Sequence, residues 1–301
     1  MKKKSTPSFV TADVIVPKKY SGRFVFAKIL SYATLILFSI IIIVPFLIAI
    51  ITSLTPDLQL TENGFQWFTG IIDVEYYLKL LTSNEHGNLF RCFGNTMLYI
   101  LPPLLVGTFC SALAAYAFAR IPFKGKNVAF YLMLSTMVIP GIITTFPSYL
   151  LFIQVYQVDR WFPLFPLIVP GMFGSVGTMF FLKQYFSTLP RDLEEAAEMD
   201  GMSRFGMFLK IILPISIPAI ITQLLLGFNG LYNDYLGPLL YLGGKPNLYT
   251  MQLYVYGLST SYNTSYPLLM AGGLLALLPT FILYLFGQKF FVEGITMTGI
   301  K

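Results

Sequence analysis

The acidic side chains of this sequence gather in one short segment, residues 190–218. Five carboxylates lie between Arg191 and Arg204, and these two arginines are the only basic residues there, so the net charge is −3. The five are Asp192, Glu194, Glu195, Glu198 and Asp200. No nucleophile–base set accompanies them, and the chain has a single histidine. We therefore expect neither enzyme activity nor a histidine-based metal site in this chain.

The acidic segment has the pattern of two helices joined by a glycine. Asp192 is suited to cap the first helix, with the acid Glu195 three residues on. Gly201 can end that helix because glycine adopts the left-handed turn conformation without a steric penalty. A second helix is expected over Met202–Lys210, leading directly into an apolar segment at Ile211.

An amphipathic helix of this kind can lie on a membrane surface or dock on a protein. Surface helices favour Lys and Arg, because the cytoplasmic lipid surface is anionic. This helix is acidic instead, and Ala196 and Ala197 form a notch of small side chains beside the acids. Both features favour docking into a groove on a basic protein partner.

The rest of the chain has the composition of a membrane protein. Of its 301 residues 55% are hydrophobic and only 11% are charged. Its long uncharged runs provide the roughly 20 helical residues that cross about 30 Å of hydrocarbon. We predict an all-α protein with six membrane-spanning helices, at about 24–51, 95–119, 127–157, 161–182, 211–233 and 267–288.

The positive charges indicate how these spans are oriented. With six spans and a cytoplasmic N-terminus, 16 of the 20 Lys and Arg residues fall in cytoplasmic segments. The positive-inside rule therefore predicts that both termini are cytoplasmic. Residues 1–23 then form a basic cytoplasmic tail, and 183–210 form a cytoplasmic loop. This distribution does not indicate binding to nucleic acid.

The sequence offers no internal source of energy for transport. The phosphate-binding pattern G-x-x-x-x-G-K-[ST] is absent, so we do not expect this chain to bind ATP. The spans hold no ionisable residue at mid-depth, where proton- or sodium-coupled carriers commonly place one. A self-contained secondary carrier is therefore disfavoured. A membrane-embedded enzyme is also disfavoured, because it would need polar catalytic residues inside the bilayer and the predicted spans lack them.

Two groups of polar residues are candidates for lining a translocation pathway. Thr144 and Thr145 lie between Pro140 and Pro147 in the third span, where a kinked helix is expected. These hydroxyls could equally serve helix packing. The second group ends the fifth span, where amide and aromatic side chains suit a sugar but are also ordinary in the outer headgroup layer. Its members are Asn229, Tyr232, Asn233 and Asp234.

Between the first two spans, residues 52–93 form a large loop with an aromatic cluster. The cluster comprises Phe65, Trp67, Phe68, Tyr76 and Tyr77. It fits either an aromatic belt at the membrane interface or a contact surface for an extracellular partner.

The acidic segment resembles the EAA loop of binding-protein-dependent ABC importer permeases. The resemblance rests on Glu195-Ala196-Ala197, Gly201 after three further residues, and Ile211-Ile212-Leu213-Pro214 after nine more. In that family the loop is the coupling helix, which docks into the ATPase subunit. The resemblance implies an ATPase-coupling role for Glu195, Ala196, Ala197, Asp200, Gly201, Leu213 and Pro214.

Other segments resemble the carbohydrate, maltose-type permeases. These are AYAFARIPFKGK at residues 115–126 and QKFFVEGITMTGIK at residues 288–301, although Tyr232 stands where related permeases carry Trp. The resemblance implies a multi-pass subunit in a bacterial cytoplasmic membrane, forming half of a pathway for a sugar, an oligosaccharide. It also implies a second permease, two ATPase copies that hold ATP and magnesium, and an extracellular binding protein. A permease for another small solute is the alternative.

Overall fold

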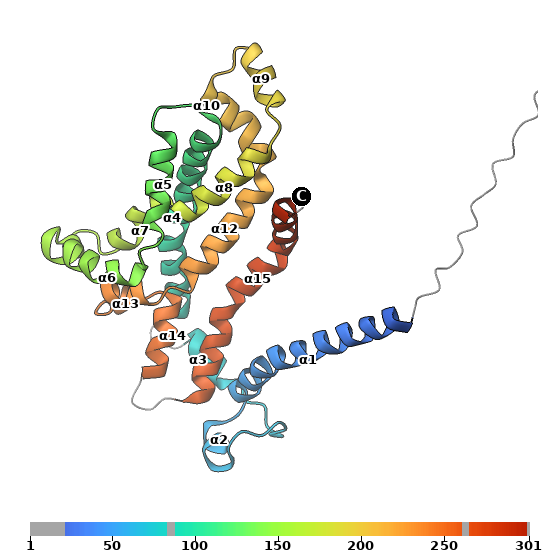
Figure 1. Ribbon diagram of the computed structural model, residues 1–301. Helices are drawn as coiled ribbons and strands as arrows, with labels where there is room; N and C mark the ends of the chain where they lie inside the picture. The colour runs from blue at the N-terminus through green and yellow to red at the C-terminus, as the bar shows by residue number, and fades with distance from the viewer. Residues whose placement is uncertain (1–21, 83–87, 261–264, 300–301) are drawn as a thin grey trace, which may run out of the picture. The chain divides into compact units, whose positions relative to one another are not determined.

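The computed structural model describes residues 22–82, 88–260 and 265–299, and all regular elements in these ranges are helices. The chain divides into two compact units, Met1–Ile48 and Ala49–Lys301. The described part of the first unit belongs to one long helix, α1 (Gly22–Ser53). The second unit contains all the other helices (Figure 1). The expected all-α class is confirmed.

The described chain contains four helical stretches that are long and apolar enough to cross a membrane. They are α1, α4 (Leu89–Arg120), α7 with α8 (Phe165–Met172 and Val176–Thr188) and α15 (Tyr266–Gly299). Two bent helix pairs also pass this test, so the described chain has six spans if each pair counts as one. The first pair is α5 (Lys126–Thr136) with α6 (Gly141–Leu150) and the π-helical turn η1 (Leu151–Val155). The second joins α10 (Arg204–Met207), the π-helical turn η3 (Phe208–Ile212) and α11 (Leu213–Ile215) to α12 (Ile217–Tyr232).

Short helices connect the spans. They are α2 (Asp57–Asn63), α3 (Glu75–Thr82), α9 (Asp192–Met199), α13 (Leu236–Leu242), α14 (Met251–Thr260) and the 3₁₀ turns η2 (Val158–Arg160) and η4 (Pro246–Leu248). Within the second unit, α3 and α9 lie near opposite ends of α4 (Figure 1).

The second span differs in length from the helix expected, and the third has the kink expected of it in the form of a sharp break. The predicted span 95–119 is six residues longer at its start, because Asn88 caps α4 and its side chain accepts a hydrogen bond from the Arg91 backbone at 3.0 Å. The predicted span 127–157 is broken, with a bend of 85° between α5 and α6. Pro140 occupies the N-cap position of α6, where its missing N–H group costs nothing.

Helix α4 is the packing centre of the second unit, because α7, α8, α12 and α14 all lie against it (Figure 1). Its contact with α7 is very close: a Cβ atom added at Gly107 would lie 2.3 Å from the Gly171 carbonyl oxygen. Directly after this contact the chain breaks between α7 and α8, at Gly174, whose φ is +98°. The Ser111 hydroxyl accepts a hydrogen bond from the Ser175 N–H at 2.8 Å and so satisfies a backbone group freed by the break.

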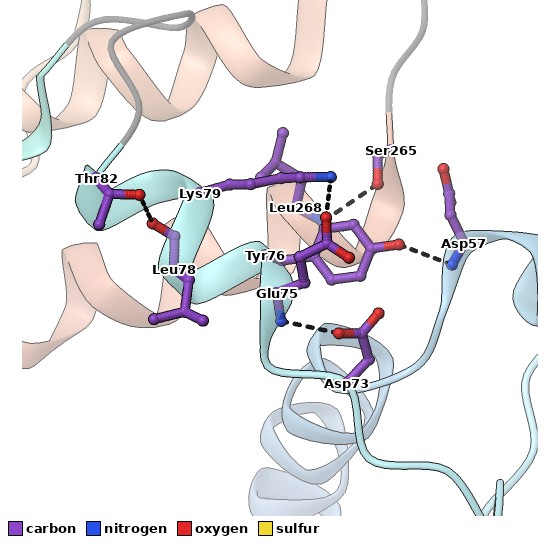
Figure 2. Close-up of polar contacts among 9 residues, drawn as sticks. All are labelled: Asp57, Asp73, Glu75, Tyr76, Leu78, Lys79, Thr82, Ser265 and Leu268. Atoms are coloured by element: carbon purple, nitrogen blue, oxygen red, sulfur yellow. Dashed lines mark hydrogen bonds and ion pairs between the residues drawn. The ribbon is translucent and has the colours of Figure 1, made fainter.

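Around α3, polar contacts fasten the chain that follows α1 (Figure 2). The Tyr76 hydroxyl accepts a hydrogen bond from the Asp57 backbone N–H at 2.9 Å, and Asp73 accepts one from the Glu75 N–H at 2.8 Å. Lys79 pairs with Glu75 at 2.8 Å, and this hydrogen bond raises the pKa of the Lys79 ammonium. Tyr76 thus holds the chain at Asp57 against α3. Phe68, of the same predicted aromatic cluster, is instead 95% exposed.

The α4–α7 contact leads to a prediction about stability. Gly107→Val should lower the free energy of unfolding by about 1–3 kcal/mol, because the added side chain overlaps the α7 backbone. Gly94→Val is the matched control, since a Cβ at Gly94 of the same helix meets nothing within 4 Å. Thermal unfolding of both variants in detergent measures the difference. Equal melting temperatures would show that the close approach does not constrain this fold.

Candidate functional site

The acidic helix α9 begins where the sequence indicates, but its cap differs. Asp192 is its first residue, and Arg191 stands at the N-cap position without a side-chain cap. The prediction that Asp192 caps the helix is therefore wrong. Asp192, Glu194 and Glu195 occupy the first turn instead, where negative charge interacts favourably with the helix dipole.

The end of α9 confirms the turn expected at Gly201. The Gly201 N–H donates to the Glu198 carbonyl at 3.0 Å, and the Met202 N–H donates to the Ala197 carbonyl at 2.9 Å. This pair of bonds is a Schellman motif, and Gly201 has the positive φ, +77°, that the motif requires. A Cβ atom at Gly201 would meet nothing within 4 Å, so its own chain leaves this turn open.

The two alanines of α9 point to different sides. Ala197 is only 5% exposed and is buried within its own chain, so the prediction that both alanines fit a groove on a partner is wrong for Ala197. Ala196 is exposed, as is Glu195, and Met199 is 88% exposed. We call the exposed side chains of Leu193, Glu195, Ala196, Met199 and Asp200 the outer face of α9.

One residue that the sequence did not single out connects α9 to the spans. Arg120, the last residue of α4, donates from Nη2 to the carbonyl oxygens of Phe186 and Leu189, both at 2.6 Å. Its Nε lies 3.5 Å from the Glu194 Oε1 atom, and its side chain is 4% exposed. The one local feature of the sequence that could have indicated this role is that Arg120 directly ends an apolar span.

A polar groove of about 170 Å³ lies between α9 and the end of α4. Three carboxylates and three arginines line it, so their charges balance. Its lining residues are Tyr116, Arg120, Pro122, Arg191, Glu194, Glu195, Glu198, Arg204 and Met207.

The chain from α9 back into the fifth span forms a bent elbow. The Ser203 side chain caps α10 by accepting a hydrogen bond from the Gly206 N–H at 3.1 Å. The Leu213 N–H donates to the Phe208 carbonyl, five residues back, directly before Pro214, which has no N–H group. The 78° bend follows at Ser216, between Pro214 and Pro218 rather than at either proline.

The threonine candidates for the pathway make only local bonds. Thr144 and Thr145 both donate to the Gly141 carbonyl, at 2.8 and 3.0 Å, and Thr144 is exposed on α6. A backbone carbonyl of their own helix thus satisfies both hydroxyls. Their place in a pathway stays a prediction.

The candidates at the end of α12 separate into buried and exposed residues. Tyr232 is 1% exposed, and its hydroxyl donates to the Ala276 carbonyl of α15 at 2.7 Å. It belongs to helix packing, so its prediction as a pathway residue is wrong. Asp234 accepts a hydrogen bond from the Gly237 N–H at 3.1 Å and shapes the turn before α13.

Asn229 and Asn233, four residues apart, form an exposed pair of amides. Asn233 Nδ2 donates to Asn229 Oδ1 at 2.9 Å, and Gln252 of α14 donates to Asn233 Oδ1 at 3.4 Å. Beside them Tyr235 and Tyr256 stack, with ring centroids 5.6 Å apart and 46% and 41% exposure. Gln252 and Tyr256 were not singled out from sequence, because nothing local pairs α14 with the end of α12.

A family profile described as a binding-protein-dependent transport system inner membrane component matches residues 107–296. This match covers more than half of the chain. The chain belongs to this family.

Two relatives of this importer permease are similar over nearly their whole length. The arabinooligosaccharides transport system permease protein AraQ of Halalkalibacterium halodurans is 30% identical over 263 residues, covering 87% of this chain and 92% of that protein. The maltodextrin transport system permease protein MdxG of Bacillus subtilis is 28% identical over 276 residues, covering 91% and 96%.

The fold of the permease also matches a solved structure. One chain of a bacterial ABC transporter involved in the import of the acidic polysaccharide alginate superposes with a TM-score of 0.76 at 20% identity. The superposition covers 90% of this chain and 99% of that one. The permease is therefore a multi-pass membrane protein whose fold is that of an ABC importer subunit, and its family range includes α9 and the end of α12.

Proposed function

We propose that this permease imports a sugar, an oligosaccharide, and that α9 couples it to a separate ATPase. Two relatives named for arabinooligosaccharides and maltodextrin support the substrate class. The exposed amides and stacked tyrosines at the end of α12 support it chemically, because amides bond hydroxyls and rings stack on sugar C–H groups. Import of another small solute is the alternative.

The proposed assembly has several other members. This chain forms half of the pathway, and a second permease supplies the other half. Two ATPase copies hold ATP and magnesium, and an extracellular binding protein delivers the sugar. Both termini and α9 lie on the cytoplasmic side.

The observation that carries the coupling proposal is the outer face of α9. It offers the small Ala196 and the apolar Met199 between the acids Glu195 and Asp200. A groove on a basic partner would cover the apolar atoms and pair the acids. Leu213 and Pro214 belong to the elbow through which movement of α9 would reach α12.

Substitutions at Gly201 test the coupling. Gly201→Val should abolish transport, because a β-branched residue cannot hold the left-handed turn, which costs about 1–2 kcal/mol even for ordinary residues. Gly201→Asn should retain transport, since asparagine tolerates this conformation. Uptake and ATPase stimulation by the loaded binding protein are measured in proteoliposomes that contain the whole complex.

Gly64→Val is a control for backbone strain alone, because Gly64 ends α2 with a positive φ of +67° that favours glycine and is equally open. Sugar uptake by Gly64→Val should fall no further than strain in a surface turn explains. The loaded binding protein should still stimulate the ATPase. Normal transport by Gly201→Val with the ATPase bound would contradict the coupling proposal.

A second prediction concerns the exposed amides. Asn233→Ala and Gln252→Ala should each slow sugar uptake and leave the amount of assembled complex unchanged, because Asn233 is exposed and Gln252 is only half-buried. Asn127→Ala, which removes an exposed amide of α5, is the control. Wild-type uptake in both test variants would assign these amides to the surface alone.

A further inference from the structure

We infer that Arg120 is a positioning residue for coupling, which holds α9 in fixed register with α4 and α8. The inference rests on the proposed docking of α9. It is carried by the hydrogen bonds from Arg120 to Phe186 and Leu189 together with its ion pair with Glu194, and we call these three contacts the Arg120 link.

The Arg120 link joins three elements through one side chain. Arg120 ends α4, Phe186 and Leu189 lie at the end of α8, and Glu194 lies in the first turn of α9. The last carbonyl groups of a helix have no partner within it and carry its negative dipole end. A guanidinium group can bond two of them from one nitrogen and still present Nε to a carboxylate, because its donors are arranged in a planar fork. A lysine ammonium has no such geometry.

The link is also enclosed. The Arg120 side chain is 4% exposed and the Glu194 side chain 18%. Arg120 Nε and Glu194 Oε1 are buried and have no hydrogen-bond partner within the described chain, so each relies on their ion pair at 3.5 Å. Each atom therefore depends on the other, and water cannot replace either one readily.

The link lies where a mechanical connection is needed. Helix α4 packs against α7, α8 and α12, whereas α9 is not among the helices that pack closely along it. From α9 the chain reaches the spans through the loop after α8 and through the elbow at 203–216. Arg120 adds a third, side-chain route, which leads directly to α4.

The test uses the complete transporter in proteoliposomes. Arg120→Lys keeps the charge but loses the fork, and Glu194→Gln keeps the shape but loses the charge. We expect both variants to bind the ATPase and to hydrolyse ATP, with the amount of sugar imported per ATP falling about tenfold, within the usual range of coupling between sites. The double variant should be no worse than the worse single one, because the two residues act as a unit.

Arg191→Lys is the matched control, since Arg191 lines the same groove but is exposed. It should leave sugar imported per ATP unchanged. If Arg120→Lys does not fold, Glu194→Gln alone decides the question. A folded Glu194→Gln complex with normal coupling overturns the inference.

The same assay separates this inference from the proposed docking. Normal coupling in Glu194→Gln, together with lost coupling in Gly201→Val, contradicts the Arg120 link alone. Normal coupling in both contradicts the docking of α9 itself.

Discussion

The fold depends on the close contact of α4 with α7 and α8. Gly107 and Gly171 let two backbones approach to a distance that no side chain would allow. Without a hydrophobic driving force between helices inside a bilayer, such close packing is a main source of helix association. Because α12 also packs on α4, and α15 on α12, α4 connects these spans of the second unit.

The same spans contain breaks that a soluble protein would solvate with water. The polar groups freed at the α7–α8 break are satisfied by Ser111, and those at the end of α8 by Arg120. Ser216, at the 78° bend, has a buried hydroxyl without a hydrogen-bond partner in the described chain. The bundle is thus firmly bonded at two of its breaks and less so at the elbow that follows α9.

Local sequence pattern was sufficient for the all-helical class and for the end of the acidic helix. Long hydrophobic runs indicated the membrane-spanning class, and the spacing of Gly201 from the acids located the end of α9. Tyr232 and Ala197 show that such patterns do not determine which residues of a helix are buried. Helical periodicity says that a helix has two faces, but it does not say which face meets the rest of the chain, so both residues were placed on the wrong side.

The Arg120 link and the Gln252 contact were missed for a related reason. Arg120 bonds residues 66 and 69 positions away, and Gln252 bonds Asn233 across 19 positions and a separate helix. No local pattern encodes such pairs, because they depend on how the helices come together.

We propose above all that the ATPase covers the outer face of α9 on the cytoplasmic side. In a background without Cys92 and Cys110, Ala196→Cys and Ala197→Cys are treated with a membrane-impermeant maleimide. We predict that Ala196→Cys reacts only in inside-out vesicles and becomes protected when the ATPase is added, whereas Ala197→Cys stays unreactive throughout. Labelling of Ala196→Cys in intact cells, or equal labelling with the ATPase bound, would contradict the proposed docking of α9.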